Sequence, residues 1–344
     1  MNDNGKTKKT VIGIETSCDE TSVAVMRGDE LLSNVISSQI EIHRRFGGVV
    51  PEIASRNHLT AILPVITEAL EKAGVGLGDI DAVAVTYGAG LVGALLVGVS
   101  AAKSLSYALG VPLYAVNHIQ AHIAANYIAS PELKPPYLAI VASGGHTGVV
   151  RVDGYNSFTA LGTTSDDAIG EAFDKVARAL NLPYPGGPEI DKRAKLGKAD
   201  IEFISHKKHG PLSYSGLKTA VVNYLHTMEQ RGEKVDINDV CASFQKTAVD
   251  MLADVAIDAV KSTGADTIVL AGGVAANSYL RAKLKAEGEK RNLKTYFPPM
   301  SLCTDNAAMV ARRALDMIKE GLPPATLNLN AVSYLPISEC YKPQ

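Results

Sequence analysis

Cysteine is scarce in this sequence and is not arranged in pairs. Only four cysteines occur in 344 residues, and none belongs to a CxxC motif. This scattering argues against the disulfide framework of a small secreted protein and gives no support to a cysteine-based zinc site. The chain also starts without an apolar stretch, so no signal peptide is indicated, and we expect a cytoplasmic protein. The cysteines are Cys18, Cys241, Cys303 and Cys340.

An excess of positive charge is also missing. The chain has 34 basic and 36 acidic side chains, a net charge of −2, which argues against nucleic-acid binding through overall charge. A local basic surface is still compatible with this balance, and Arg44 with Arg45 and the segment 206–220 are the candidates. The longest apolar run, residues 90–110, contains Lys103 and three serines. We therefore interpret it as a buried helix and expect no association with a membrane.

What the chain does contain is the composition of a packed globular protein. Hydrophobic residues make up 46% of it and charged residues 20%, and the length fits two domains. Apolar and β-branched runs predict strands, and apolar residues at helical spacing predict helices. In the first part of the chain we expect strands at 10–16, 21–27 and 31–38, a helix at 54–73, a strand at 82–88, a helix at 91–109 and a strand at 112–117.

The same order of elements starts again near Pro135. IGIETSCDETSVAV and LAIVASGGHTGVVRV both give a strand, a polar turn and a strand led by threonine, with little residue identity. We expect strands at 136–144, 147–153 and 158–164, helices at 167–180, from about Ser215 and at 238–262, a strand at 266–273, a helix at 277–290, a strand at 295–299 and a helix at 305–319.

Two successive βββαβα units predict an α/β protein with the actin-like, sugar-kinase-like fold. In that fold two RNase H-like lobes face each other across a nucleotide cleft; a doubly wound single sheet is the alternative. We expect a first lobe over 1–134, a second lobe with a helical insertion over 135–304, and a C-terminal helix and tail over 305–344 that returns toward the first lobe.

The segment HIQAH is the most specific candidate for chemistry. It places His118 and His122 four residues apart, on one face of a helix, where two imidazoles can reach one metal ion. In the alternative, one histidine caps or packs and the other is solvated. Because this helix begins after the carboxyl end of a buried strand, where α/β proteins place their sites, we favour a ligand pair. Ile119 stands where HExxH peptidases carry their glutamate, so peptidase chemistry is poorly supported.

Asp305 is a candidate third ligand. A carboxylate commonly completes a site with two histidines on zinc or ferrous iron. The alternative is that Thr304 or Asp305 is the N-cap of the helix that follows. The sequence leaves both interpretations open.

Two glycine pairs follow predicted buried strands. VASGGHTG contains Gly144 and Gly145, and VLAGGVAAN leads to Asn277 at a helix start. Tandem glycines let backbone N–H groups approach an anion, and a helix N-terminus attracts phosphate. Each pair alone is also compatible with an ordinary turn, with Asn277 as an N-cap. Together, at equivalent strand ends, they favour one ligand bound between them.

Carboxylates gather in two further places. Asp167, Glu171 and Asp174 lie on or near one predicted helix, and Asp191 follows in YPGGPEID. They suit bonds to ribose hydroxyls or to a substrate amine, and a solvated acidic helix edge is the alternative. The turn SCDE contributes Asp19 and Glu20, which suit contacts to metal-bound water or proton transfer.

Taken in order, these motifs resemble one family, the universal tRNA N6-adenosine threonylcarbamoyltransferases of the bacterial TsaD type. The resemblance runs over about residues 10–331 and is specific as a set. It is carried by GIETSCDETSVAV, HIQAH, VASGGHT, YPGGPEID, YSGLKTAV, LAGGVAANSYLR and TDNAAM.

The resemblance implies a site and a reaction. One divalent metal, usually iron and sometimes zinc, is held at the positions of His118, His122 and Asp305. The reaction moves a threonylcarbamoyl group from threonylcarbamoyl-AMP to the exocyclic amine of the adenosine at position 37 of tRNAs that read codons starting with A. ATP or AMP is the other expected occupant of the cleft. The implied substrate strip is Val141, Ala142, Ser143, Gly144, Gly145, Asp174, Gly187, Asp191 and Asn277.

The resemblance also implies partners and leaves one role open. Members work with tRNA, a smaller paralogous subunit of the TsaB type, a P-loop ATPase of the TsaE type, and a separate synthase that makes the adenylate. Our hypothesis for the base that removes the amine proton is Asp19 or Glu20. The main alternative function is a small-molecule kinase or an ATPase of the same fold. Like a non-enzymatic ATP-binding scaffold, it leaves HIQAH without a role.

Overall fold

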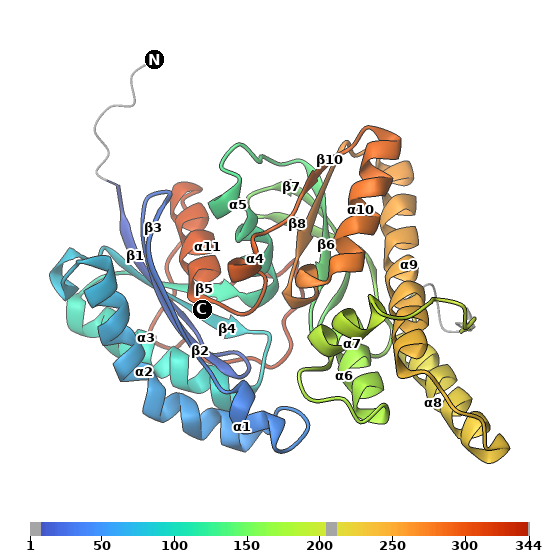
Figure 1. Ribbon diagram of the computed structural model, residues 1–344. Helices are drawn as coiled ribbons and strands as arrows, with labels where there is room; N and C mark the ends of the chain where they lie inside the picture. The colour runs from blue at the N-terminus through green and yellow to red at the C-terminus, as the bar shows by residue number, and fades with distance from the viewer. Residues whose placement is uncertain (1–7, 204–211, 343–344) are drawn as a thin grey trace.

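The computed structural model describes residues 8–203 and 212–342, and the first residues of the basic segment 206–220, up to 211, lie outside it. Two lobes stand side by side, each built on one five-stranded sheet (Figure 1). The strand order is β3-β2-β1-β4-β5 in the first sheet and β10-β9-β6-β7-β8 in the second.

The first lobe follows the predicted βββαβα order. β1 pairs antiparallel with β2 and parallel with β4, so the carboxyl ends of β1, β4 and β5 meet at one edge. Its elements are β1 (Thr10–Glu15), β2 (Glu20–Arg27), β3 (Glu30–Ser38), α1 (Ile40–Arg44), α2 (Pro51–Ala73), β4 (Ala82–Gly88), α3 (Val92–Leu109), β5 (Leu113–Asn117), α4 (His118–Ala124) and α5 (Asn126–Ala129).

The second lobe repeats this topology, which confirms the predicted duplication. β6 pairs antiparallel with β7 and parallel with β9, as β1 does with β2 and β4. Its elements are β6 (Tyr137–Ala142), β7 (Thr147–Gly154), β8 (Ser157–Thr163), α6 (Ile169–Ala179), α7 (Gly186–Ala194), α8 (Tyr214–Arg231), α9 (Ile237–Thr263), β9 (Thr267–Ala271), α10 (Ser278–Arg291) and β10 (Lys294–Tyr296); α11 (Ala307–Lys319) follows.

Helix α7 was not predicted from the sequence, and neither were the short helices α1 and α5. The first three residues of α7 are Gly186, Gly187 and Pro188, which suggested a loop. Proline is tolerated in the first turn of a helix, where its missing N–H has no intrahelical partner. The carboxylate of Asp174 accepts a hydrogen bond from the N–H of Gly186 at 2.7 Å, so a tertiary contact caps the helix.

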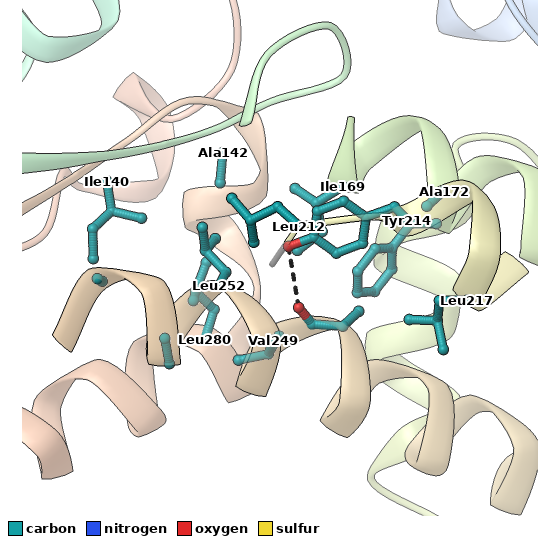
Figure 2. Close-up of a cluster of buried hydrophobic side chains, with 14 of the residues drawn as sticks. Ile140, Ala142, Ile169, Ala172, Leu212, Tyr214, Leu217, Val249, Leu252 and Leu280 are labelled. Carbon is teal, nitrogen blue, oxygen red and sulfur yellow. Dashed lines mark hydrogen bonds between the residues drawn. The ribbon is translucent and has the colours of Figure 1, made fainter. Parts of the chain in front are cut away.

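The core of the second lobe joins its sheet to the inserted helices. Figure 2 shows Ile140 and Ala142 of β6 beside Leu252 of α9, all within one buried cluster. The hydroxyl of Tyr214, fully buried at the start of α8, donates to the carbonyl of Ala248 in α9 at 3.3 Å. Burial of a Tyr hydroxyl requires such a partner. The insertion is therefore packed into the lobe and supports the carboxyl edge of β6.

Helix α11 packs on the first sheet although it follows the second sheet in sequence. Its buried residues form one cluster with Val11 of β1 and Ala24 of β2, and the N–H of Ala307 donates to the Ser22 hydroxyl at 2.9 Å. The closest approach is at Gly13, where an added Cβ would lie 2.6 Å from the carbonyl oxygen of Ala307. The residues after α11 continue along the first lobe, where Ala325 bridges to Leu113 of β5.

We therefore predict that Gly13→Val is strongly destabilising. The added atoms have no space beside Ala307 and Ala311, and overpacking of this kind costs about 1–3 kcal/mol. For a chain of this size each kcal/mol lowers Tm by roughly 2–4 °C or less, which calorimetry resolves. Gly78→Val is the matched control, because an added Cβ there meets nothing within 4 Å. An unchanged Tm for Gly13→Val would contradict this packing.

The apolar run at 90–110 forms α3. By length and composition it is the one helix of the described residues that resembles a membrane span, and 39% of it is buried inside the structure. It packs on the first sheet: Val99 and Ala102 belong to a core cluster with Ile12 and Val85, and the carbonyl of Ala94 accepts from the Thr16 hydroxyl at 2.9 Å.

Candidate metal centre and cleft

Three side chains from distant parts of the chain converge beside the carboxyl edge of the first sheet. The Nε2 atoms of His118 and His122 lie 3.5 Å and 3.0 Å from Oδ1 of Asp305. The imidazoles stand edge to face, with ring centroids 4.6 Å apart. Asp305 is not the N-cap of α11, and neither is Thr304, because Asn306 takes that position with its side chain accepting from the N–H of Met309. The Asp305 side chain is thus available to the histidines.

These distances fit a metal site. The three candidate donor atoms all lie within 4.8 Å of one another. With metal–ligand bonds of about 2.1 Å, neighbouring ligands are about 3.0 Å apart at octahedral angles and about 3.4 Å apart at tetrahedral angles. The separations to Asp305 match both values. Two imidazoles and one carboxylate suit ferrous iron or zinc and leave further coordination positions for a substrate.

Glu15 orients His118 from behind. It lies fully buried at the end of β1, and its Oε2 is 3.4 Å from Nδ1 of His118 and accepts from the Thr86 hydroxyl at 2.5 Å. A carboxylate on Nδ1 keeps Nε2 free to coordinate. The sequence analysis missed Glu15; the available signal was an acidic residue at the end of an otherwise apolar strand.

The charges of this cluster are mutually stabilising. Burial lowers the pKa of His118, but the carboxylates of Asp305 and Glu15 outweigh it and raise the pKa to about 9. Burial raises the pKa of Asp305, while His118 and His122 lower it to about 2. Without a metal the cluster holds a proton on His118; because coordination requires the neutral imidazole, that proton must leave when a metal binds.

A third histidine, His146, faces the pair from the second lobe. Burial, and then the nearby His118 and His122, lower its pKa to about 4, so it is neutral at pH 7. Its backbone N–H donates to the Ser143 hydroxyl at 3.0 Å, which closes the SGGH turn between β6 and β7. We did not select His146 from the sequence, although it stands within the quoted motif SGGHT. The glycine turn of one lobe therefore adjoins the histidines of the other.

The acidic turn of the first hairpin faces the same space. Asp19 is 6% exposed, and its Oδ2 has no hydrogen-bond partner among the described residues. Glu20 begins β2, and its Oε1 accepts from the Ser38 hydroxyl at 3.2 Å. Burial, followed by Asp19 and Asp305, raises the pKa of Glu20 well above its usual value of 4.5. The carboxylates of Asp19 and Asp305 therefore both disfavour a charge on Glu20.

Open space lies over the glycine turns. A Cβ added at Gly144, Gly145 or Gly273 would meet nothing within 4 Å. The turns touch each other, since an added Cβ at Gly272 would lie 2.5 Å from the carbonyl oxygen of Ala142. The side chains of Val141 and Ala142 are buried in hydrophobic clusters, so these two residues can meet a ligand only through their backbone.

The remaining residues of the predicted substrate strip belong to α6, α7 and the start of α10. Asp174 is bonded to Gly186, and the pKa of its carboxyl is raised mainly by burial. Asp191 accepts from the Ser278 hydroxyl at 2.7 Å. Asn277 is the N-cap of α10, accepting from the N–H of Leu280 and donating to Gln245. Its amide still has one N–H and one lone pair for a ligand. Gly187 is open, with nothing within 4 Å of an added Cβ.

Asp167, just before α6, and Glu171 of α6 have basic partners. Lys175 is paired with both Asp167 and Glu171, at 2.9 Å and 2.8 Å. Lys218 of α8 also contacts Asp167. These pairs match the alternative of a solvated acidic edge, whereas Asp174 bonds to the backbone at the start of α7.

Comparison with known proteins agrees with this arrangement. The profile of the family described as "TsaD: tRNA N6-adenosine threonylcarbamoyltransferase" matches residues 30–312. A protein of Clostridium perfringens named tRNA N6-adenosine threonylcarbamoyltransferase is 55% identical over 327 residues, which cover 93% of this chain and 96% of that protein.

Solved structures support the fold at low sequence identity. (R)-2-hydroxyglutaryl-CoA dehydratase component A of Acidaminococcus fermentans has a TM-score of 0.57 at 15% identity, covering 90% of this chain and 99% of that chain. The ROK hexokinase of Thermus thermophilus has a TM-score of 0.50 at 16% identity, covering 91% and 100%. The predicted actin-like, sugar-kinase-like fold is confirmed.

Proposed function

This chain belongs to the tRNA N6-adenosine threonylcarbamoyltransferase family, and from that membership we propose that it carries out the transfer at a metal centre of His118, His122 and Asp305. It is an acyltransferase that forms threonylcarbamoyladenosine in tRNA. The observation that supports the metal centre is the convergence of three donor atoms within 4.8 Å of one another, from α4 and from the residue before the N-cap of α11.

Complementarity between the open glycine turn and a phosphate supports a position for the substrate. We propose that the nucleotide part of threonylcarbamoyl-AMP, or ATP or AMP, lies over Gly144 and Gly145 and reaches the strip formed by Asp174, Gly187, Asp191 and Asn277. Backbone N–H groups of the open SGGH turn suit the phosphate. In this proposal the acyl group points toward the histidines, since His146 of this turn lies near enough to His118 and His122 for them to lower its pKa.

The chemistry follows from the weakness of the nucleophile. The exocyclic amine of adenosine has its lone pair delocalised into the ring, so orientation of the acyl carbon and the amine must supply much of the rate. A bound divalent metal, iron before zinc in our proposal, supplies Lewis-acid polarisation of a carbamoyl or carboxylate oxygen. Asp19 or Glu20 takes the amine proton. Glu15 holds His118 in the coordinating tautomer. His146 is neutral at pH 7 and therefore adds no positive charge to the site.

The partners belong to the proposal as well. tRNA is the acceptor of the family reaction. We propose a cytoplasmic enzyme that works with a smaller paralogous subunit of the TsaB type and a P-loop ATPase of the TsaE type, supplied by an adenylate synthase. The near-neutral charge supports this, since tRNA affinity must then come from a local basic surface or from partners.

Reconstitution tests the proposal. The chain is combined with synthase, partners, threonine, bicarbonate, ATP and unmodified tRNA, and nucleosides are quantified by mass spectrometry. We expect modified adenosine at position 37, dependence on the chain, and about one divalent metal per chain by elemental analysis. Modification by a chelator-treated enzyme at the full rate would refute the metal centre while leaving the transferase activity intact. Phosphorylation of a small molecule without tRNA would instead support the kinase alternative.

The open turn makes a selective variant available. We predict that Gly145→Val raises KM for the adenylate by about 10-fold or more, since the new side chain fills space over the turn while meeting no protein atom at its Cβ. Single-turnover kinetics at varied adenylate concentration measure this effect. Gly78→Val is the matched control, because an added Cβ there also meets nothing within 4 Å and the residue has no positive φ. An unchanged KM would place the adenylate elsewhere.

A further inference from the structure

The segment 336–340 near the C-terminus lies across the helix that carries both histidines. Asn117, the N-cap of α4, accepts from the N–H of Ile119 at 3.0 Å. Its amide nitrogen donates to the carbonyls of Pro336 at 3.0 Å and Glu339 at 3.2 Å. One side chain thus fixes the first turn of α4 and holds the tail against it.

Gln120 makes the second attachment. It stands between the two histidines in HIQAH, and two residues along a helix correspond to about 200° of rotation, so it lies on the face opposite them. It is 2% exposed. Its amide nitrogen donates to the carbonyls of Ile337 at 2.7 Å and Glu339 at 3.2 Å. Most of the acceptors on the tail are therefore backbone carbonyls, and the thiol of Cys340 also contacts the Gln120 amide, at 3.5 Å.

Arg313 connects this helix to the element that follows the third ligand. It projects from α11 and is 1% exposed. Its Nε and Nη2 both donate to Oε1 of Gln120, at 3.1 Å and 3.0 Å, and its guanidinium lies over the ring of Phe158. Its Nη1 has no hydrogen-bond partner among the described residues, so the two bonds to Gln120 are the ones that join α11 to α4. Asp305 lies just before the N-cap of α11.

We infer that Gln120, together with Arg313 and the backbone of 336–340, positions the metal centre: it holds α4 at the angle at which His118 and His122 meet Asp305. This inference rests on the proposed metal centre. Gln120 is a positioning residue, since it contacts the ligand-bearing elements from behind and points away from the substrate space. The tail is then part of the site, although none of its side chains is a ligand.

Metal affinity tests this without any assay of activity. Co²⁺ binding to the full chain is measured by competition with a chromophoric chelator, and the Co²⁺ absorption spectrum reports ligand geometry. We expect Gln120→Leu to weaken Co²⁺ binding about 10–100-fold, the usual effect of removing a partner behind the ligands, and to alter the spectrum. A chain ending at Leu335 should do the same by an independent route. Glu339→Ala is the matched control, because it keeps the carbonyl acceptor.

A further variant separates the effect of lower stability on Co²⁺ binding from the effect of misplaced ligands. Val65→Ala, a cavity in the α2 core, is expected to lower the stability of the metal-free protein while leaving Co²⁺ affinity and spectrum unchanged. If folded Gln120→Leu, or the shortened chain, binds Co²⁺ within twofold of the wild type with the same spectrum, the positioning role is refuted and the metal centre stands. The inference requires the wild type to bind Co²⁺. If it binds none, the proposed metal centre is wrong and the positioning role of Gln120 is refuted with it.

Discussion

Replacing His118 and His122 together with alanine is expected to abolish stoichiometric metal binding and to lower the rate of adenosine modification by about 10³-fold. Two of the three donors are then absent, and Asp305 alone does not retain a divalent ion. Loss of metal polarisation is worth several kcal/mol of transition-state stabilisation, and each 1.36 kcal/mol is tenfold in rate. Single-turnover transfer to tRNA and elemental analysis measure the two effects.

Control variants separate the loss of metal binding and of transfer activity from misfolding. His226→Ala removes an exposed histidine of α8 and should change neither quantity. Removing His118 also leaves Glu15 and Asp305 buried without their partner, which destabilises the lobe. Asp305→Asn, which keeps the shape of the side chain, is therefore measured alongside. A double variant that is folded, metal-free and fully active would exclude a catalytic metal.

The second large effect is expected at the acidic turn. Glu20→Gln should lower the rate of transfer by about 10²–10⁴-fold if Glu20 is the base, the range for losing a positioned proton acceptor. Its raised pKa favours it, because a base is most effective when its pKa lies closer to the working pH. The wild-type rate should rise with pH as this carboxyl deprotonates, and the rise should disappear in the variant.

Asp19→Asn decides between the two candidates. Its unpartnered Oδ2 is available for a substrate proton or a water, so a larger loss for Asp19→Asn would assign the role there. Glu30→Gln, exposed at the start of β3, is the control. If Asp19→Asn and Glu20→Gln both transfer within threefold of the wild type, neither residue is the base.

Much of the fold was predictable because its signals are local. Strands such as TVIGIE and AVAVTYG are uniformly buried, and the repeat of hairpin, helix and parallel strands appears as a repeat of pattern. The predicted start of α11 was two residues early because its N-cap is Asn306, one of several capping residues in a row, while its end at Lys319 was as predicted. Helix α7 was missed because its start is stabilised by Asp174, twelve residues earlier, and no local pattern signals that bond.

The site also combines features that local sequence predicts with features that depend on contacts between distant segments. HIQAH specified a histidine pair by helical geometry alone, and SGGHT and AGG specified turns that admit a ligand. Which carboxylate joins the histidines could not be decided locally, since Asp305 had an equally good local interpretation as a cap. The roles of Glu15, His146, Gln120 and Arg313 could not be assigned from the sequence, because each acts through contacts with distant segments.

The sequence by itself determined the elements, their repeated order and the residue types suited to a metal and a nucleotide, because helical period, strand burial and turn chemistry act over a few residues. Only the tertiary structure decided that Asp305 meets His118 and His122, that Glu15 orients His118, and that the tail supports α4. Those contacts span up to 222 residues of sequence and exist only once both sheets and α11 are packed.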